Sequence, residues 1–174
     1  MIKIVMIYDQ IQAGLGTKTD TMIPLGAKNV PIGPSIMMER FLKEYDEKVI
    51  ACFFCGTGTY FENGQEISRK ICNKIEMIKP DVVLCGPAFD YKDYAKMCAE
   101  LAYGINDRTS VPAFASMAKE NEEVIAAFKE KVNIVKCPKK GETELNKSLK
   151  NMCSMAKILA EKSVPKDQYK DYVY

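Results

Sequence analysis

Short apolar runs in this chain alternate with longer stretches in which apolar residues recur every three or four positions. The short runs are typical of strands buried on both faces of a sheet, and the longer stretches are typical of helices with one buried side. The predicted strands are Ile2–Tyr8, Lys48–Phe54, Asp81–Cys85, Val111–Ala115 and Val132–Val135. Because a helix is expected after each strand, the pattern predicts repeated βα units and a parallel sheet.

The predicted helices begin at residues that commonly start helices. Pro34 stands in the first turn of the first helix, and Asn63-Gly-Gln-Glu66 has the spacing of a capping box. Asp90 and Asn121 are expected to cap the next two helices, and the last helix is expected over Thr143–Glu161. We therefore expect an α/β fold, with three layers around a doubly wound, parallel, five-stranded sheet in the flavodoxin-like order 2-1-3-4-5.

Length and composition favour one globular domain. The 174 residues are 47% hydrophobic and 28% charged, which excludes a disordered or fibrous chain. We assign residues 1–164 to a single α/β domain and residues 165–174 to a polar and aromatic C-terminal tail that is loose or docked on a partner. A net charge of +2 with scattered basic residues argues against binding to nucleic acid or to anionic membranes.

The expected location is the cytoplasm. Met1–Tyr8 is too short for the apolar region of a signal peptide, and polar Asp9 follows it directly. No run approaches the roughly 18 apolar residues of a membrane span. The seven cysteines are an odd number without a compact framework, which is typical of reduced thiols in a reducing compartment.

The absence of histidine narrows the chemistry. It excludes a Ser-His-Asp mechanism and the ordinary zinc sites that contain histidine, and we predict no metal site. Any proton transfer has to use Cys, Tyr, Lys, Asp or Glu side chains.

A ligand site is expected beyond the carboxyl ends of the strands, near the switch in strand order. That rule selects the segments Ala13–Gly16, Gly33-Pro34, Cys55–Asn63, Gly86–Tyr91 and Met117–Asn121. Gly14 and Gly16 would let the backbone approach a ligand closely, and a flexible connection explains them equally well. Helices that start near Gly33 and Asn63 would direct free N–H groups at the mouth of the expected site, the crevice at the carboxyl ends of the strands. Every doubly wound fold shares this feature.

Cys55 is the candidate nucleophile, because it stands where the second strand gives way to this mouth. Cys52 lies inside the strand and points to the opposite face, so a thioredoxin-like pair of Cys52 and Cys55 is not expected. Cys85 is the equivalent residue of the third strand, about 10 Å from Cys55 across one strand, beyond the ~7 Å that a disulfide tolerates. The thiols of Cys55 and Cys85 either flank a ligand or fill tightly packed positions.

Aromatic and acidic residues near the mouth complete the candidates. The aromatic residues, which would either wall a pocket or form a subunit contact, are Tyr60, Phe61, Phe89, Tyr91 and Tyr94. Glu62 and Glu120 are candidate acids or bases if burial raises their pKa values.

The same segments carry an ordered set of short motifs. They are Ala13-Gly-Leu-Gly16, Gly33-Pro34, Cys55-Gly56, Tyr60-Phe61-Glu62-Asn63, Pro80-Asp81, Gly86-Pro87-Ala88-Phe89 with Tyr94 and Cys98, and Pro112 with Met117 and Glu120-Asn121. In this order and spacing the chain resembles the amino-terminal half of component B of the clostridial-type glycine, sarcosine and betaine reductases. The resemblance covers about residues 1–160.

The resemblance implies a subunit of an oxidoreductase complex that deaminates small amino-acid-like substrates reductively. In that family, component B is the substrate-specific part and passes a carboxymethyl group to a selenoprotein partner, component A. The family's selenocysteine lies in the second half of the subunit, which has no counterpart here. We therefore expect a substrate-binding part that is not active alone and carries no cofactor. The expected partners are a small carboxylate or amino-acid-like ligand, other subunits of the complex, and a second copy in a homodimer.

The resemblance and the strand-end rule together define the expected substrate site. Its residues are Gly14, Gly16, Gly33, Cys55, Gly56, Tyr60, Glu62, Asn63, Cys85, Pro87, Ala88, Phe89, Tyr94, Met117, Glu120 and Asn121. The chain departs from the family pattern at Asp90-Tyr91-Lys92-Asp93, where an Arg is usual, and this reverses the local charge. Glu122 replaces a usual Pro, and the loop Cys55–Asn63 carries a one-residue insertion.

Two other functions fit the same residues. A non-catalytic binding or assembly subunit would use the pocket for recognition and the Tyr-rich tail for docking. A flavodoxin-like carrier would hold a flavin, which we do not expect, and a colourless purified protein would exclude it.

Overall fold

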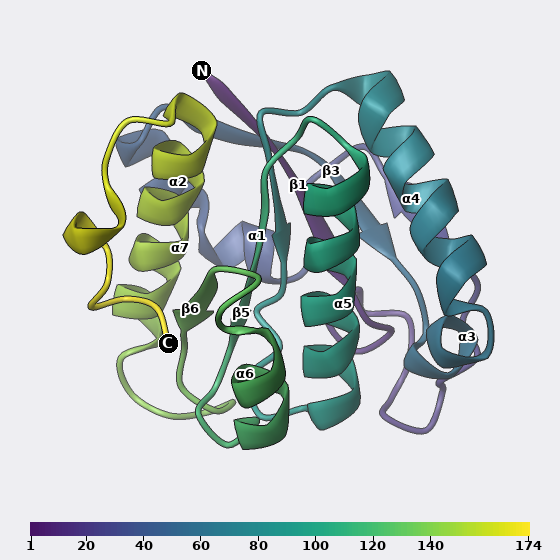
Figure 1. Cartoon of the computed structure of the whole chain (residues 1–174). Helices are drawn as coiled ribbons and strands as arrows, with labels where there is room; N and C mark the ends of the chain where they lie inside the picture. The colour runs from purple at the N-terminus through teal and green to yellow at the C-terminus, as the bar shows by residue number, and fades with distance from the viewer.

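A computed structural model describes all residues, 1–174, as a mixed six-stranded sheet with helices on both faces (Figure 1). The strands are β1 (Ile2–Tyr8), β2 (Gly26–Lys28), β3 (Glu47–Phe54), β4 (Val82–Cys85), β5 (Ala113–Met117) and β6 (Ile134–Lys136). They lie in the order β2-β3-β1-β4-β5-β6. Strand β2 runs antiparallel to β3, and all other neighbouring strands are parallel.

The α/β class is confirmed, and the prediction of a wholly parallel five-stranded sheet was wrong by one edge strand. Strand β2 lies inside the long connection after β1 and pairs Gly26 with Phe54 and Ala27 with Phe53. Its three residues carry no strand pattern of their own, so only the tertiary pairing makes them a strand. The five parallel strands, numbered without β2, keep the relative order 2-1-3-4-5.

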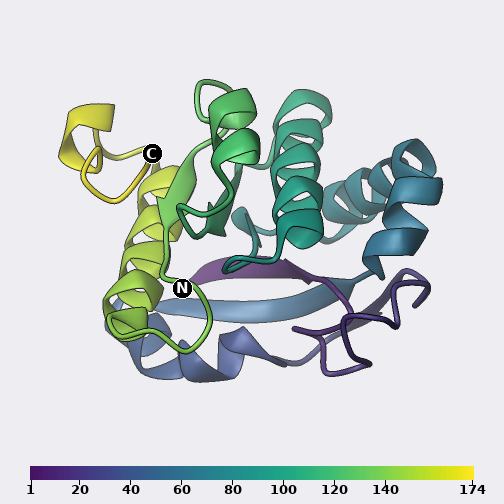
Figure 2. The ribbon, with the colours of Figure 1, turned by 90° about the horizontal axis from the view of Figure 1, so that it is seen from below.

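The helices form the two outer layers, as Figures 1 and 2 show. On one face lie α3 (Thr57–Glu62), α4 (Gly64–Ile78), α5 (Lys92–Arg108) and α6 (Glu122–Phe128). On the other face lie α1 (Pro34–Met37), α2 (Glu39–Glu44) and α7 (Leu145–Glu161), and a short 3-10 helix, η1 (Lys166–Gln168), follows α7. The three predicted layers are therefore present.

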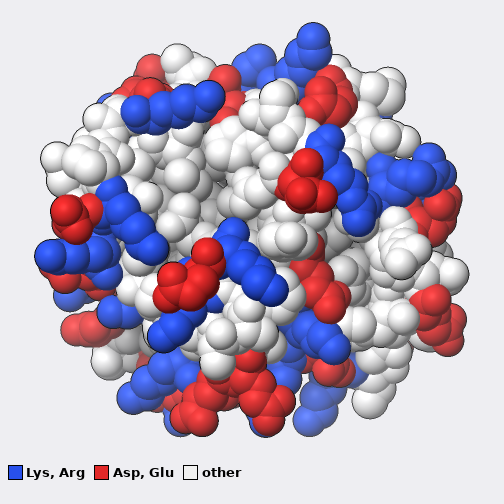
Figure 3. Space-filling view, in the orientation of Figure 1, with Lys and Arg blue, Asp and Glu red and all other residues white.

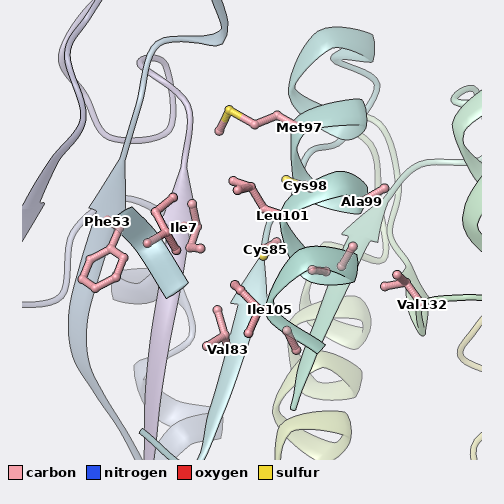
Figure 4. Close-up of a cluster of buried hydrophobic side chains, with 14 of the residues drawn as sticks. Ile7, Phe53, Val83, Cys85, Met97, Cys98, Ala99, Leu101, Ile105 and Val132 are labelled. Atoms are coloured by element: carbon pink, nitrogen blue, oxygen red, sulfur yellow. The ribbon is translucent and has the colours of Figure 1, made fainter. Parts of the chain in front are cut away.

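Each strand of the centre contributes to two cores, because successive side chains point to opposite faces. Val5 and Ile7 pack on the α4–α5 side, whereas Ile4 and Met6 pack on the α2–α7 side. Figure 4 shows the first of these cores, where Ile7 and Leu101 meet between the sheet and α5.

The predicted caps were wrong in detail, although the helices exist. Asn63 ends α3 and precedes α4, but its side chain makes no capping hydrogen bond. Tyr91, not Asp90, is the N-cap residue of α5. Asn121 does precede α6, but its side chain is used in a tertiary contact described below.

The C-terminal residues extend the far edge of the sheet. Val173 forms an antiparallel bridge with Val135, and the N–H of Lys136 donates to the carbonyl oxygen of Tyr172 at 2.7 Å. The Tyr174 hydroxyl donates to the carbonyl oxygen of Met117 at 3.0 Å. The tail is thus docked on β6 of its own chain. None of the helices has the length and apolar character needed to cross a bilayer.

Candidate functional site

The parallel strands end at one edge of the sheet, and the direction of their connections reverses between β1 and β4. The chain leaves β1 for β3 on one side and then crosses over to β4 on the other. Strand ends are level there, since Tyr8 pairs with Phe54 and Ile7 pairs with Cys85. In open α/β sheets, ligands bind in the crevice at this reversal.

A cavity of about 180 Å³ lies at this point. It is lined by Asp9, Gln10, Ile11, Lys18, Thr57, Tyr91, Lys92, Asp93 and Tyr94. These residues come from the connections that follow β1, β3 and β4. The volume lies below the roughly 300–1,000 Å³ of pockets for drug-sized molecules, so it suits a ligand of few heavy atoms.

Asp9 is the buried charge of this cavity. Only 1% of its surface is exposed, and its Oδ1 accepts the N–H of Gln12 at 2.7 Å. Burial raises the pKa of Asp9 to about 6, and the hydrogen bond with Gln12 opposes this shift. A carboxylate with this environment is stabilised in its charged form by a cationic ligand group.

Gln10 fixes the walls of the cavity relative to each other. Its Oε1 accepts the N–H of Thr57 at 3.2 Å, and its Nε2 donates to the carbonyl oxygen of Thr17 at 3.3 Å. The side chain is 2% exposed. It therefore joins the exit of β1 to the start of α3 and to the loop that carries Lys18.

The N-terminus of α5 brings partial positive charge to the cavity, opposite in sign to the Asp9 carboxylate. The first backbone hydrogen bond at this end runs from the N–H of Ala95 to the carbonyl oxygen of Tyr91, and no side chain caps the helix. The N–H groups of residues 92–94 therefore lack helical partners and carry the partial positive charge of the helix terminus. Lys18 and Lys92 add two cationic side chains to the same cavity.

A larger cavity of about 510 Å³ lies at the ends of β5 and β6. Lys119, Lys136 and Lys139 line it together with Glu120, Glu142 and Glu144, so its charges balance. It lies away from the reversal between β1 and β4. We place the candidate site at the smaller cavity, because a buried carboxylate and an uncapped helix start meet there.

Most of the sequence-predicted site residues lie outside the smaller cavity, and only Tyr94 lines it. The Tyr94 side chain is buried, and its hydroxyl donates to the carbonyl oxygen of Ile7 at 2.8 Å. Tyr60 is buried beside α5 and donates to Glu100 at 2.9 Å. Glu62 and Asn63 are exposed at the end of α3.

The two predicted thiols lie in the core. Cys55 and Cys85 are fully buried, and Figure 4 shows Cys85 between the sheet and α5. Burial raises the pKa of Cys55 to about 11 and also raises the pKa of Cys85. An activated thiol needs a lowered pKa, so this environment does not activate Cys55, and its catalytic role stays a prediction. Cys52 packs on the opposite face of the sheet from Cys55, as expected.

Three of the four predicted glycines lie where the chain leaves no room for a Cβ. Gly33 has a φ of +56°, and a Cβ there would collide with the carbonyl oxygen of Gln12. A Cβ on Gly56 would collide with the carbonyl oxygen of Thr21, and one on Gly16 would meet the Asp20 side chain. Gly14 is exposed, with open space around it.

The segments after β4 and β5 are tied to each other. Ala88 donates its N–H to the carbonyl oxygen of Ser116, and Ala118 donates its N–H to that of Phe89, both at 2.8 Å. The Nδ2 of Asn121 also donates to the Phe89 carbonyl oxygen, at 2.7 Å. Pro87, Ala88, Phe89, Met117 and Asn121 are buried in this contact, and Glu120 is exposed beside it.

Sequence reasoning missed the polar lining of the cavity. The residues that it did not name as site residues are Asp9, Gln10, Lys18, Lys92, Asp93 and also Thr57, which lies inside the selected segment Cys55–Asn63. A signal for Asp9 was present, because it is the first charged residue after an apolar strand and stands at that strand's carboxyl end. Elsewhere the surface carries charges of both signs intermixed, as Figure 3 shows for one face.

Comparison with known proteins decides the family. The whole chain, residues 1–174, matches the family model described as glycine/sarcosine/betaine reductase selenoprotein B (GRDB). The chain belongs to this family. The resemblance expected from the motifs is thereby confirmed.

Two curated relatives in the GRDB family illustrate the similarity. The chain is 27% identical over 123 residues to the sarcosine reductase complex component B subunit beta of Peptoclostridium acidaminophilum. It is 32% identical over 124 residues to the glycine reductase complex component B subunit gamma of Carboxydothermus hydrogenoformans. Each alignment covers 71% of this chain and 28% of the relative. No solved structure matches the chain.

Proposed function

We propose that this chain is a component B-type subunit, or a relative of one, of a glycine/sarcosine/betaine reductase-type complex, and that it binds a small amino-acid-like ligand between β1 and β4. Membership of the GRDB family supports the first part, since the relatives carry the names of glycine and sarcosine reductase subunits. The observation that carries the second part is the buried Asp9 carboxylate, which shares one cavity with the start of α5.

The two ends of the cavity suit the two charges of an amino acid. A ligand ammonium beside Asp9 restores the favourable environment that burial removes from the carboxylate. A ligand carboxylate at the start of α5 accepts the unpaired N–H groups and lies near Lys18 and Lys92. The small volume favours amino acids without long side chains.

The ligand is bound here without a nucleophile from Cys55. The thiol is buried and its pKa is raised to about 11, so it stays protonated near neutral pH. This observation favours the second candidate function, a binding or assembly subunit whose reaction partner is another protein of the complex.

Isothermal titration calorimetry on the purified chain tests the ligand class. Glycine, sarcosine and betaine are titrated beside acetate and methylammonium, each of which offers only one of the two charges. We expect the doubly charged ligands to bind more tightly than either single-charge ligand. Equal binding of acetate and glycine, or no heat with any ligand, would refute the ligand class.

The complex is tested separately. A tagged chain is purified from its native host, and mass spectrometry identifies the proteins that stay bound. Other reductase-complex subunits are the expected partners. If these subunits are absent although glycine still binds the chain, the proposed complex is refuted and the proposed ligand site is retained.

A further inference from the structure

The outer edge of β2 is a strand edge without a partner in the chain. Strand β2 is terminal in the sheet and pairs only with β3. Outside that ladder, no hydrogen bond involves the backbone of Gly26, Ala27 or Lys28. In an antiparallel pair, alternate residues direct their N–H and C=O groups away from the neighbouring strand. Strand β2 therefore offers unpaired groups to an added strand.

An apolar groove lies next to this edge on the α4 side. It has a volume of about 210 Å³ and is lined by Leu25, Gly26, Ala27, Phe53, Ile71 and the lysines 70 and 74. Ala27 is paired with Phe53, whose ring belongs to the core under α4, so Ala27 faces the same side. Met22 and Val30, each 54% exposed, flank the strand along the chain.

Lysines frame the edge on both faces of the sheet. Lys70 and Lys74 stand one turn apart on α4 above the groove. Lys28 lies two residues from Gly26, which faces Phe54, and so points to the opposite face. Lys28 and Lys74 form no ion pair, and Lys70 is 3.8 Å from Glu66.

These features select one kind of occupant. A second copy of the chain paired through β2 would bring two identical sets of lysines together, and like charges across a strand pair repel. An added strand whose apolar side chains cover the groove points its other side chains to the opposite face, where acidic ones would meet Lys28.

We propose that the β2 edge is a docking surface for an extended segment of another protein, in which apolar and acidic residues alternate and which adds a strand to the sheet. Backbone hydrogen bonds to β2 hold the segment, the groove under α4 takes alternate apolar side chains, and Lys28 on the opposite face favours acidic side chains at the positions between them.

A defined peptide tests the surface on the full chain. The probe is a fluorescent peptide of about ten residues that alternates valine and glutamate, and the matched probe alternates valine and lysine. Fluorescence anisotropy is recorded for the unaltered chain and for the variant Lys28→Glu, which reverses the charge on the face that would receive the glutamates. The variant Lys147→Glu, at an exposed position of α7, matches its charge change.

The glutamate peptide should bind the unaltered chain and the Lys147 variant alike, and bind the Lys28 variant about tenfold more weakly. Amide hydrogen exchange at residues 26–28 should slow when it binds. Three outcomes overturn the proposal: no binding up to ~1 mM peptide, equal binding of the lysine peptide, or no protection of residues 26–28. Self-association in sedimentation that the glutamate peptide suppresses would assign the edge to a second copy instead.

Discussion

The Tyr94 hydroxyl and the Ile7 carbonyl oxygen are joined by a buried hydrogen bond of 2.8 Å. The same carbonyl oxygen accepts the N–H of Gly86 at 3.3 Å. One acceptor at the end of β1 therefore holds both the first turn of α5 and the segment after β4. These are the elements that form the wall of the cavity opposite Gln10.

Replacing Tyr94 with Phe removes the hydrogen bond to the Ile7 carbonyl oxygen and keeps the aromatic ring. We expect the free energy of unfolding to fall by about 1 kcal/mol, because Ile7 keeps a second donor and only one buried hydrogen bond is lost. Urea denaturation followed by circular dichroism measures the change. Tyr103→Phe is the matched control, since Tyr103 is 45% exposed on the same helix and its hydroxyl makes no hydrogen bond. Equal midpoints for the Tyr94 variant and the unaltered chain would show that this hydrogen bond is not stabilising.

Replacing Asp9 with Asn removes the buried charge but keeps an oxygen for the N–H of Gln12. The raised pKa means that the protonated form is favoured in the fold, so this carboxyl contributes stability at pH values below about 4 that is lost as the pH rises through about 6. The Asn variant should therefore fold at pH 7 at least as stably as the unaltered chain.

Ionisation of Asp9 lowers the stability of the fold but should strengthen ligand binding. The carboxylate that attracts a ligand ammonium is lost as the pH falls through about 6, so glycine should bind about tenfold more weakly one unit below that pH. Calorimetry at pH 5 and pH 7 measures this, and Asp9→Asn should bind weakly at both. Asp107→Asn is the control, because Asp107 is exposed on α5 and does not line this cavity. A pH-independent affinity in the unaltered chain would contradict the role of Asp9.

The relative order of the parallel strands could be predicted because short, continuous apolar runs alternate with periodic helices. Strand β2 could not, since Gly26-Ala27-Lys28 becomes a strand only by pairing with Phe53 and its neighbours. The side chain of Asn121 suggests a helix cap by its position. In the fold it donates instead to the Phe89 carbonyl oxygen, a partner 32 residues away that no local pattern contains.

The cavity with Asp9 lies at the edge of the sheet where the site was predicted, and of the predicted site residues only Tyr94 lines it; the other predicted residues stay a prediction. Cys55 follows the strand in sequence, yet its N–H continues the ladder to the carbonyl oxygen of Tyr8, which keeps its side chain inside the core. Asp9 was open to prediction as the first charge at the end of β1. The α5 start was not, because its exposed N–H groups depend on the absence of a capping side chain at Tyr91.

The reactivity of Cys55 separates a buried thiol from a catalytic one. A pKa near 11 leaves very little thiolate at neutral pH. We expect alkylation by iodoacetamide at pH 7.5 to be slower by on the order of 100-fold or more than in the chain unfolded by urea. Mass spectrometry of peptides over time measures the rate at Cys55, and Cys55→Ser should bind glycine like the unaltered chain. Rapid native alkylation that glycine suppresses would make Cys55 a nucleophile after all.

Glu47 should dominate the dependence of stability on pH between about 7 and 8. It is 5% exposed at the start of β3, and neither carboxyl oxygen accepts a hydrogen bond from a nitrogen or oxygen donor. Burial raises its pKa from 4.5 to about 8; the Cys153 thiol and Lys157 oppose the shift, and Glu161 adds to it. Glu47 therefore contributes stability that is complete below about pH 4.5 and is lost as the pH rises through about 8.

Replacing Glu47 with Gln should flatten this slope. Between pH 7 and 8 the chain has no histidine to titrate, and Asp9 is already mostly ionised, so we expect the unaltered chain to lose about 1 kcal/mol of unfolding free energy as Glu47 ionises. Urea denaturation at half-unit steps from pH 6.5 to 8 measures both chains. Glu123→Gln, an exposed change on α6, should keep the slope. Parallel pH profiles for Glu47→Gln and the unaltered chain would place the titrating group elsewhere.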